Sequence, residues 1–253
     1  MALIVTPAIV LSTIRYSESS KIVRLATRDL GVQSAIAKGA LRPRSRFGAA
    51  LQVLSAGQAQ LHVKENRELH TLGAFDLTRV PVALAADLDR YAAASVLAEI
   101  MLRFAPPDPH PASYELLAAS LDELEQAPAS TAGALGLRRI WHLVSVLGFA
   151  PSLDACVHDG APVAPGGELA FSTRDGGAVC AACAGPSGAT RLPPDARAAL
   201  AALLHPDAPL PALDPRHAAA HRRLLSRYVR YHLAEGGELP ALEFWTRRRW
   251  VAA

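Results

Sequence analysis

The sequence has few cysteines, no long apolar run and no recognisable leader, and each shortage argues against a class of protein. Three cysteines among 253 residues are too few, and odd in number, for a disulfide framework. No stretch approaches the roughly 20 consecutive apolar residues that a membrane span requires. The opening MALIVTPAIVLSTIRY lacks a basic n-region and is interrupted by Pro7, so we expect no secretory signal. Together these features predict a cytoplasmic protein without membrane contact.

Composition and motifs favour a folded protein that is not an enzyme. Hydrophobic residues make up 51% of the chain and charged residues 19%, which supplies apolar material for packed cores. No G-x-x-x-x-G-K-[ST] loop occurs in the sequence, so we expect no use of ATP. Candidates for an open metal position beside a general base are weak, and we therefore expect no catalysis.

Positive charge is concentrated in the first 80 residues. This segment holds 11 Lys and Arg against 5 Asp and Glu, a balance of +6. The remaining 173 residues hold 15 against 18, a balance of −3. A basic N-terminal third suits a polyanionic partner, and nucleic acid is the first one to consider.

The same 80 residues predict a small β-barrel. Short β-branched or alternating runs follow one another, namely AIVLSTIRY, SKIVRLATR, VQSAIAK, LQVLSAGQAQLHV and LHTLGAFDL. Between the second and third runs, TRDLG (27–31) suits a hairpin turn in which Gly31 adopts positive φ. Five strands in about 80 residues indicate an OB-fold barrel. An SH3-like barrel or a small sandwich would give much the same pattern.

One loop of this domain is dense in arginine. The segment AKGALRPRSRFGAALQ (37–52) contains no acidic residue, and Gly39 and Pro43 argue against a helix. Its arginines alternate, so they would point to one side if the segment were extended. Guanidinium groups suit phosphate oxygens, and an aromatic ring suits a stacked base. The candidate nucleic-acid residues of the loop are Lys38, Arg42, Arg44, Arg46 and Phe47.

Two further candidates lie on the predicted strand 20–28. Alternation places Arg24 and Arg28 on the face opposite Val23 and Leu25, so both arginines could line one surface. The alternative for the basic loop is a solvated segment that keeps the domain soluble.

Helical segments follow the barrel and are interrupted by a module of different composition. The expected helices span 87–104, 112–126, 131–147, 194–204 and 216–233. Residues 151–188 are rich in Gly, Pro, Asp and Ser and hold too little apolar material for a core of their own. The predicted architecture is therefore α+β and multidomain. It comprises an OB-fold domain (1–80), a first helical part (81–150), a zinc-finger-like module (151–188) and a second helical part (189–253).

All three cysteines fall within the module 151–188. Cys180 and Cys183 form a C-x-x-C pair, while Cys156 is followed three positions later by Asp159. Two tight turns of this spacing, with twenty residues between them, match a two-knuckle zinc site. Carboxylate and imidazole both ligate zinc, so Asp159 and His158 are alternative fourth ligands.

Such a site would be structural, because three thiolates and a fourth protein ligand leave no open position on the metal. A vestigial site with reduced thiols is the main alternative, and a catalytic thiol is a weaker one.

The predicted helix 216–233 is rich in arginine and histidine. His217 and His221 are four residues apart, but no acidic residue accompanies them as in a zinc hydrolase. We interpret them as surface or semi-buried histidines. The arginines could receive an acidic peptide, and a solvated helix face is the alternative. The candidate partner-binding residues are Arg222, Arg223 and Arg227.

These features together resemble the bacterial RecO family of DNA repair and recombination-mediator proteins. The most specific part is AIVLSTIRYSESSKIVRLATRDLGVQSAIAKGALRPRSRFGAALQ, with its TRDLG turn and basic loop. The resemblance continues through LDRYAAASVLAEIMLRF, LGFAPSLDACVHDG and GAVCAACAG to the helix RRLLSRYVRYHL. It thus covers nearly the whole chain.

The resemblance implies an OB-fold, a helical domain and a zinc module between helices. It implies binding of single- and double-stranded DNA, annealing of complementary strands, and loading of RecA, together with RecR, onto DNA coated with single-strand-binding protein. The acidic C-terminal tail of that coating protein would dock on the helical domain. Such a protein would be cytoplasmic and nucleoid-associated. The chain departs from the family pattern at Asp159, where a second cysteine would stand.

Two other functions are compatible with these residues. One is a protein-bridging zinc adaptor without direct DNA activity, and the other is a zinc hydrolase. DNA affinity that falls steeply with salt separates the mediator from the adaptor. Loss of activity on changing the basic loop, and not the cysteines, separates the mediator from the hydrolase.

Overall fold

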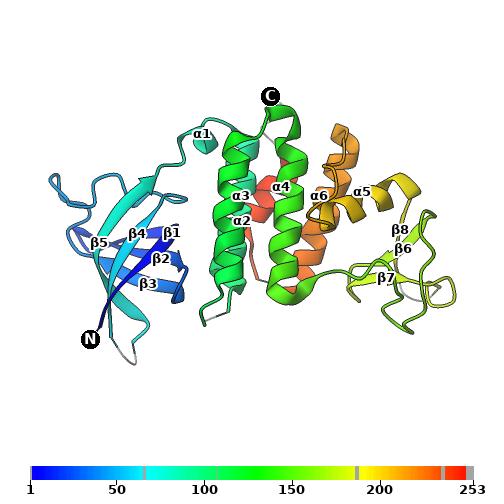
Figure 1. Ribbon diagram of the computed structural model, residues 1–253, viewed down its shortest axis with the longest axis horizontal. Helices are drawn as coiled ribbons and strands as arrows, with labels where there is room; N and C mark the ends of the chain where they lie inside the picture. The colour runs from blue at the N-terminus through cyan, green and yellow to red at the C-terminus, as the bar shows by residue number, and fades with distance from the viewer. Residues whose placement is uncertain (1, 65–66, 107, 186–187, 235–236, 249–253) are drawn as a thin grey trace. The chain divides into compact units, whose positions relative to one another are not determined.

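The chain forms two compact units. The computed structural model describes residues 2–64, 67–106, 108–185, 188–234 and 237–248. The first unit is Met1–Glu125 and the second is Gln126–Ala253, and Figure 1 traces the elements of each. The helical segment 81–150 is therefore divided between the two units.

The first unit begins with a closed five-stranded barrel. Its strands are β1 (Ala2–Tyr16), β2 (Ser20–Thr27), β3 (Gly31–Ala37), β4 (Ala56–Val63) and β5 (Leu69–Arg79). They close in the order β1-β2-β3-β5-β4, with β3 and β5 parallel and the other pairs antiparallel. A five-stranded barrel with this order is an OB-fold, so that prediction is confirmed, and the SH3-like and sandwich alternatives are wrong.

Strand alternation and one bulge decide which side chains fill the barrel. On β2, Val23 and Leu25 are fully buried in the core, and Arg24 between them lies on the opposite face, as alternation predicts. The register between β1 and β2 shifts between Val10 and Ser12. This bulge exchanges the inward and outward faces of β1 along its length.

The turn between β2 and β3 has the predicted geometry. Gly31 has φ of 70°, which glycine adopts without steric cost. The hydroxyl of Thr27 donates to the Gly31 carbonyl at 2.7 Å and accepts from the Leu30 amide at 3.1 Å. Side-chain hydrogen bonds of this kind stabilise a tight turn, and they place Arg28 and Asp29 at its exposed tip.

The connection between β3 and β4 completes the barrel core. Many core residues on the strands are small, among them Ala8, Ala35 and Ala59, each fully buried. Phe47 and Leu51, from the connection, pack into the same core and are each 2% exposed. The 38–55 segment is therefore anchored to the barrel by its apolar side chains.

Three helices complete the first unit: α1 (Val82–Ala85), α2 (Leu88–Phe104) and α3 (Pro111–Gln126). Asp87 caps α2, because its carboxylate accepts a hydrogen bond from the Arg90 amide at 3.0 Å. Helix α2 contacts β1 and β2. Ile9 and Ala26, which pair across these strands, are consequently buried although they lie on the outer face of the barrel.

The second unit combines helices with a small sheet. The helices are α4 (Ala129–Val144), η1 (Ser145–Phe149), α5 (Pro194–Leu204), α6 (Pro215–His232) and α7 (Pro240–Arg247). The strands β6 (Leu169–Ser172), β7 (Gly177–Val179) and β8 (Thr190–Leu192) form an antiparallel sheet in the order β7-β6-β8. Across the described residues, no helix is both long and apolar enough to span a membrane.

An aromatic cluster joins the small sheet to α6. The rings of Trp141 and Tyr228 meet edge to face, with their centroids 5.1 Å apart. The ring centroid of Phe171 in β6 lies 6.3 Å from that of Tyr228. The Nε2 atom of His232 lies 2.8 Å from the Thr173 carbonyl in the β6–β7 turn. The sheet is therefore packed against α6 by buried rings and one hydrogen bond.

The burial of Phe47 predicts a large loss of stability on truncation. We expect Phe47→Ala to lower the free energy of unfolding of the first unit by about 3–5 kcal/mol, because it leaves a cavity in the barrel core. Urea denaturation followed by far-UV circular dichroism measures this loss. Arg44→Ala in the same loop is the matched control and should leave the midpoint unchanged; equal midpoints for both variants would contradict the burial of Phe47.

Candidate nucleic-acid interface and candidate metal centre

The arginine-rich loop is a series of tight turns and not an extended segment. Amide-to-carbonyl hydrogen bonds link Arg42 to Gly39 at 3.1 Å, Ser45 to Arg42 at 3.0 Å and Gly48 to Ser45 at 3.1 Å. The Leu41 amide also donates to Ser19 in the β1–β2 turn at 2.9 Å. The premise that alternation aligns the arginines is therefore wrong, because the backbone turns between them.

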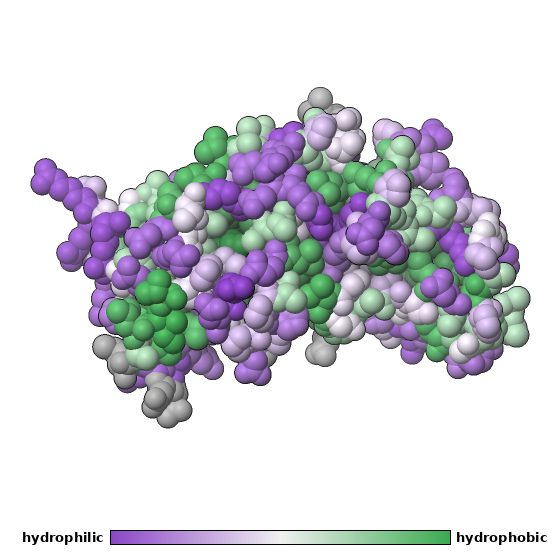
Figure 2. Space-filling view, viewed as in Figure 1, coloured by the Kyte–Doolittle hydropathy of each residue, from purple (hydrophilic) through white to green (hydrophobic). Residues whose placement is uncertain are grey.

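All four cations of the loop are nevertheless exposed. Its apolar residues Ala40, Phe47, Ala50 and Leu51 point into the core, which leaves the polar residues outside. Figure 2 shows hydrophilic side chains gathered over the β3–β4 connection, at the upper left of the view. The exposed cations are Lys38, Arg42, Arg44 and Arg46.

Phe47 does not offer a ring for base stacking, and that expectation is wrong. Its side chain is 2% exposed and belongs to the barrel core. The Arg46 guanidinium carbon lies 5.1 Å from the centroid of the Phe47 ring, within the range of a cation–π contact. Phe47 therefore anchors the loop and supports one of its arginines.

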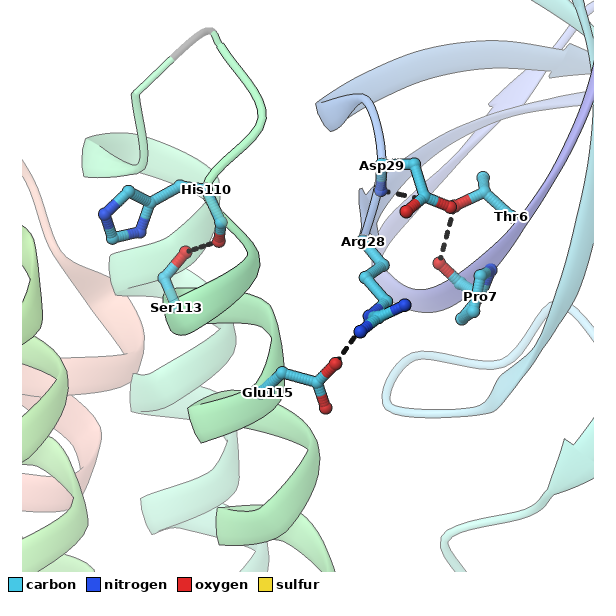
Figure 3. A network of polar contacts seen from close by, with 7 residues as sticks. All are labelled: Thr6, Pro7, Arg28, Asp29, His110, Ser113 and Glu115. Atoms are coloured by element: carbon cyan, nitrogen blue, oxygen red, sulfur yellow. Dashed lines mark hydrogen bonds and ion pairs between the residues drawn. The ribbon is translucent and has the colours of Figure 1, made fainter.

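The two strand arginines differ from the loop arginines in their surroundings. Arg28 Nε donates to Glu115 Oε1 of α3 at 2.6 Å (Figure 3), and this hydrogen bond and the charge of Glu115 raise the pKa of Arg28. Arg24 is half-buried, and its Nε atom has no hydrogen-bond partner among the described residues. Neither arginine presents a free, fully exposed charge.

Residues beside Arg28 fix the turn that carries it. The Thr6 hydroxyl donates to Asp29 Oδ2 at 2.7 Å, and the Arg28 amide donates to the Pro7 carbonyl at 3.0 Å. These contacts tie the β2–β3 turn to β1 in Figure 3. The backbone that carries Arg28 is therefore fixed by hydrogen bonds, although the side chains of Arg28 and Glu115 are each about half exposed.

The three cysteines and Asp159 come together in the second unit. One ligand atom from each of Cys156, Asp159, Cys180 and Cys183 lies within 4.8 Å of all the others. Asp159 Oδ2 is 3.3 Å from the Cys180 sulfur and 3.4 Å from the Cys183 sulfur. The predicted convergence of the two knuckles is confirmed, and the group could hold a metal ion.

Backbone hydrogen bonds shape each knuckle. In the first, the Gly160 amide donates to the Cys156 carbonyl at 2.9 Å, and the Cys156 amide donates to Ala161 at 2.8 Å. In the second, the amides of Cys183 and Ala184 both donate to the Cys180 carbonyl, at 3.1 and 2.9 Å. These turns direct the side chains of each pair to the same side.

The donor set fits zinc. Bonds of about 2.3 Å to sulfur and about 2.0–2.2 Å to oxygen give tetrahedral ligand separations of roughly 3.5–3.8 Å, close to the observed oxygen–sulfur distances. Asp159 Oδ1 accepts from the Ala161 amide at 3.0 Å, which turns Oδ2 toward the thiols. An orienting hydrogen bond of this kind commonly accompanies a metal-ligating carboxylate.

His158 points away from the thiols. Its Nε2 atom lies 3.0 Å from Asp175 Oδ2, and the Ser172 hydroxyl donates to the same oxygen at 2.6 Å. Hydrogen bonds from Ser172 and His158 lower the pKa of Asp175. Of the two alternative fourth ligands, Asp159 and not His158 belongs to the described group of side chains that could hold a metal ion.

Asp159 and Cys183 have shifted pKa values. The Ala161 amide and the three cysteines hydrogen-bond to Asp159 and hold the pKa of its carboxyl far below its usual range. A hydrogen bond with Cys180, followed by one with Asp159, raises the pKa of Cys183 to about 12. Metal binding here would require the cysteines to lose their protons, so affinity would rise with pH.

The arginines of α6 fall into two groups. Arg222 is 4% exposed, so the expectation that it receives a partner peptide is wrong. Arg223 and Arg227 are exposed and line a cavity of about 530 Å³ beside β8. Arg230 lines the same cavity and was missed, although its position one turn beyond Arg227 is a detectable signal.

Comparisons with known proteins match the chain to one family. The family described as Recombination protein O N terminal matches residues 1–80, and the family described as Recombination protein O C terminal matches residues 85–239. Together these two matches cover the barrel, the metal-ligand cluster and α6.

Similar proteins named DNA repair protein RecO occur in several bacteria. The protein from Anaeromyxobacter sp. (strain K) is 36% identical over 247 residues, which is 93% of each chain. That from Pelobacter propionicus is 37% identical over 181 residues, 70% of this chain and 71% of the relative. That from Nocardioides sp. is 33% identical over 238 residues, 90% of this chain and 94% of the relative.

The choice of Asp159 over His158 has a direct test. We expect Asp159→Ala to weaken Zn²⁺ binding by more than about tenfold, because it removes one of four ligands. His158→Ala, the matched control, should leave Zn²⁺ affinity within about twofold, and Asp159→Cys should strengthen it by supplying a fourth thiolate. Competition with a chromophoric chelator measures all three. Loss of Zn²⁺ in His158→Ala but not in Asp159→Ala would contradict the assignment.

Proposed function

The chain belongs to the RecO family, and we propose that it is a DNA repair and recombination mediator that binds single- and double-stranded DNA and anneals complementary strands. One observation carries this proposal. Four exposed cations lie within nine residues on a loop without an acidic residue, and that loop is anchored in the core of an OB-fold barrel. OB-folds bind oligonucleotides, and cations held on a fixed surface suit a phosphate backbone.

The proposed mechanism is electrostatic and requires no catalysis. Two complementary strands repel each other because each carries one negative charge per nucleotide. Lys38, Arg42, Arg44 and Arg46 would neutralise phosphates and release condensed counterions. Base pairing then supplies the free energy of annealing, so neither a nucleotide cofactor nor a covalent step is needed.

The tight turns of the loop support this mechanism. A loop fixed by backbone hydrogen bonds and by Phe47 loses little conformational entropy when it binds a strand. Its arginines would therefore contribute more binding free energy than arginines of equal number on a flexible tail. In this proposal Arg24 and Arg28 contribute less to DNA binding than the loop arginines, because Arg24 is half-buried and Arg28 is paired with Glu115.

The proposed partners follow from membership of the family. We propose that the chain acts with RecR to load RecA onto DNA coated with single-strand-binding protein, and that it works on the nucleoid in the cytoplasm. The acidic C-terminal tail of the coating protein would dock on the second unit, where Arg223 and Arg227 are exposed. In this proposal the first unit contacts DNA and the second unit contacts the partner protein.

We propose that Cys156, Cys180, Cys183 and Asp159 hold a structural zinc ion. When bound, zinc supplies a cross-link between the two knuckles of a module with little core of its own. The four side chains would fill a tetrahedral set, which leaves no position for a substrate. This argues against the zinc hydrolase and assigns the module a structural role.

Strand annealing without nucleotide tests the proposed function. We expect the purified chain to accelerate annealing of complementary single strands at low salt, and the acceleration to fall as salt rises. A variant with Arg42, Arg44 and Arg46 changed to Ala should lose most of it. The matched control changes three other exposed arginines, Arg103, Arg174 and Arg216, to Ala. No annealing by the unaltered chain, together with no DNA binding at low salt, would refute the proposal in favour of a protein-bridging adaptor.

The ion pair between Arg28 and Glu115 predicts a variant with increased DNA affinity. We expect Glu115→Gln to raise affinity for single-stranded DNA by about two- to fivefold at low salt, because it removes an acidic competitor of the phosphates. Fluorescence anisotropy with a labelled oligothymidylate measures the change. Glu123→Gln, on the same helix, is the control for net charge, and an equal gain in both variants would contradict a specific competition at Arg28.

A further inference from the structure

A mainly apolar groove in the first unit lies beside the arginine-rich loop. The groove has a volume of about 630 Å³, and its lining comes from the β1–β2 hairpin, the end of the β3–β4 connection and the segment that carries α1 and the start of α2. Ligand sites in proteins commonly have volumes in this range. Val80, Val82 and Leu88 line the groove and are exposed, Val82 by 68%. Exposed apolar side chains that gather in one groove indicate a binding surface.

The charge at the groove has one sign. Lys21 is the only charged residue in the lining, and no lining residue is acidic. Arg15 pairs with Lys21 across the β1–β2 ladder, so the two side chains lie on the same face of the hairpin. Within the described part of the chain, neither Arg15 nor Lys21 forms an ion pair. The groove therefore suits an occupant that is anionic and also carries apolar groups.

Both ends of the arginine-rich loop 37–52 meet this groove. Leu51 and Gln52, at the end of the loop, belong to the lining. At the start of the loop, Ala37 pairs with Lys21 on the β2–β3 ladder. The groove is therefore continuous with the loop whose cations carry the proposed phosphate contacts.

The groove also contains an exposed aromatic ring. Tyr91 of α2 lines it and is 38% exposed, whereas Phe47 of the loop is buried in the barrel core. Aromatic rings stack on any nucleobase, because every base has a π-face. Gln52 is exposed in the same groove, and its amide can both donate and accept hydrogen bonds. Tyr91 thus supplies the accessible ring that Phe47 does not.

We propose that this groove receives unpaired bases of a single strand. Tyr91 stacks on a base, and Lys21 and Arg15 hold the phosphates of the strand where it leaves the cations of the loop. This inference rests on the proposed DNA binding and specifies the substrate class of that surface. Bases of a duplex are paired and stacked and cannot enter the groove, whereas phosphate contacts alone would not separate a single strand from a duplex.

The surroundings of the groove favour a single strand over a protein segment. An apolar segment of another chain would fill the walls but would leave the charges of Lys21 and Arg15 without partners. A single strand carries both a phosphate and a base at every nucleotide, so it satisfies the cations and the apolar walls together. It also extends from the groove onto the loop without a change of chemistry.

A strand without bases is the probe that separates base contacts from phosphate contacts. Fluorescence anisotropy would compare a labelled oligothymidylate with an abasic strand of the same length, using the full chain at low salt. Tyr91→Ala should weaken binding of the oligothymidylate by at least about fivefold and leave binding of the abasic strand within about twofold. Tyr91→Phe keeps the ring and should bind like the unaltered chain. Tyr231→Ala, at an exposed tyrosine of the second unit, is the matched control.

Photo-crosslinking gives a readout that requires no substitution. A strand containing 4-thiothymidine would be irradiated in complex with the unaltered chain, and the crosslinked residues would be mapped by mass spectrometry. We expect crosslinks from the modified base to segments 51–53 and 80–91, which line the groove. Crosslinks confined to the loop residues 38–46 would overturn the proposal.

Two binding results would also overturn it. They are an unchanged affinity of Tyr91→Ala for the oligothymidylate, and an equal loss of affinity for both strands. Self-association of the chain that Tyr91→Ala abolishes, without any change in strand binding, would assign the groove to a second copy instead. No binding of either strand by the unaltered chain would refute the proposed DNA activity itself. Binding of both strands with equal affinity, lost in the Arg42, Arg44 and Arg46 variant, would refute only the base contacts.

Discussion

The interior of the barrel sets the geometry on which the proposed DNA-binding surface depends. Strands lined with Ala8, Ala35, Ala37 and Ala59 leave space that the strands themselves do not fill. Phe47 and neighbouring apolar residues from the β3–β4 connection occupy it. Because those side chains are held inward, the basic residues between them are directed to solvent. Packing of the core and presentation of the cations are therefore consequences of one constraint.

The second unit also contains a segment with few large apolar side chains, and other contacts hold that segment. The segment 151–188 carries few large apolar residues. Its Phe171 packs against Tyr228, which also packs against Trp141, and the cysteines and Asp159 of the same segment converge. Strand β8 of this sheet also forms a wall of the α6 cavity. The small sheet is therefore followed at β7 by Cys180 and contributes β8 to the lining of that cavity.

The sequence was sufficient for features that depend on local pattern. Alternation in β2 predicted that Val23 and Leu25 lie on the face opposite Arg24, and the spacing of the cysteines predicted their convergence. It was insufficient where a partner distant in sequence decides the outcome. Glu115 lies 87 residues from the arginine with which it pairs, and Asp175 contacts His158 while Asp159 lies with the cysteines. Phe47 was misassigned because an aromatic residue in a basic loop has the same local pattern whether it stacks on a base or fills a core.

The central claim is that a core-anchored loop carries the phosphate contacts, and the salt dependence of single-strand affinity tests it most directly. Equilibrium binding of a labelled oligothymidylate would be measured from low to moderate salt for the unaltered chain and for the variant with Arg42, Arg44 and Arg46 changed to Ala. Each lost phosphate contact lowers the slope of log K against log salt by about 0.7, so the account predicts a slope smaller by about 2. Equal slopes for the two proteins would show that the phosphates are held elsewhere and would contradict the account.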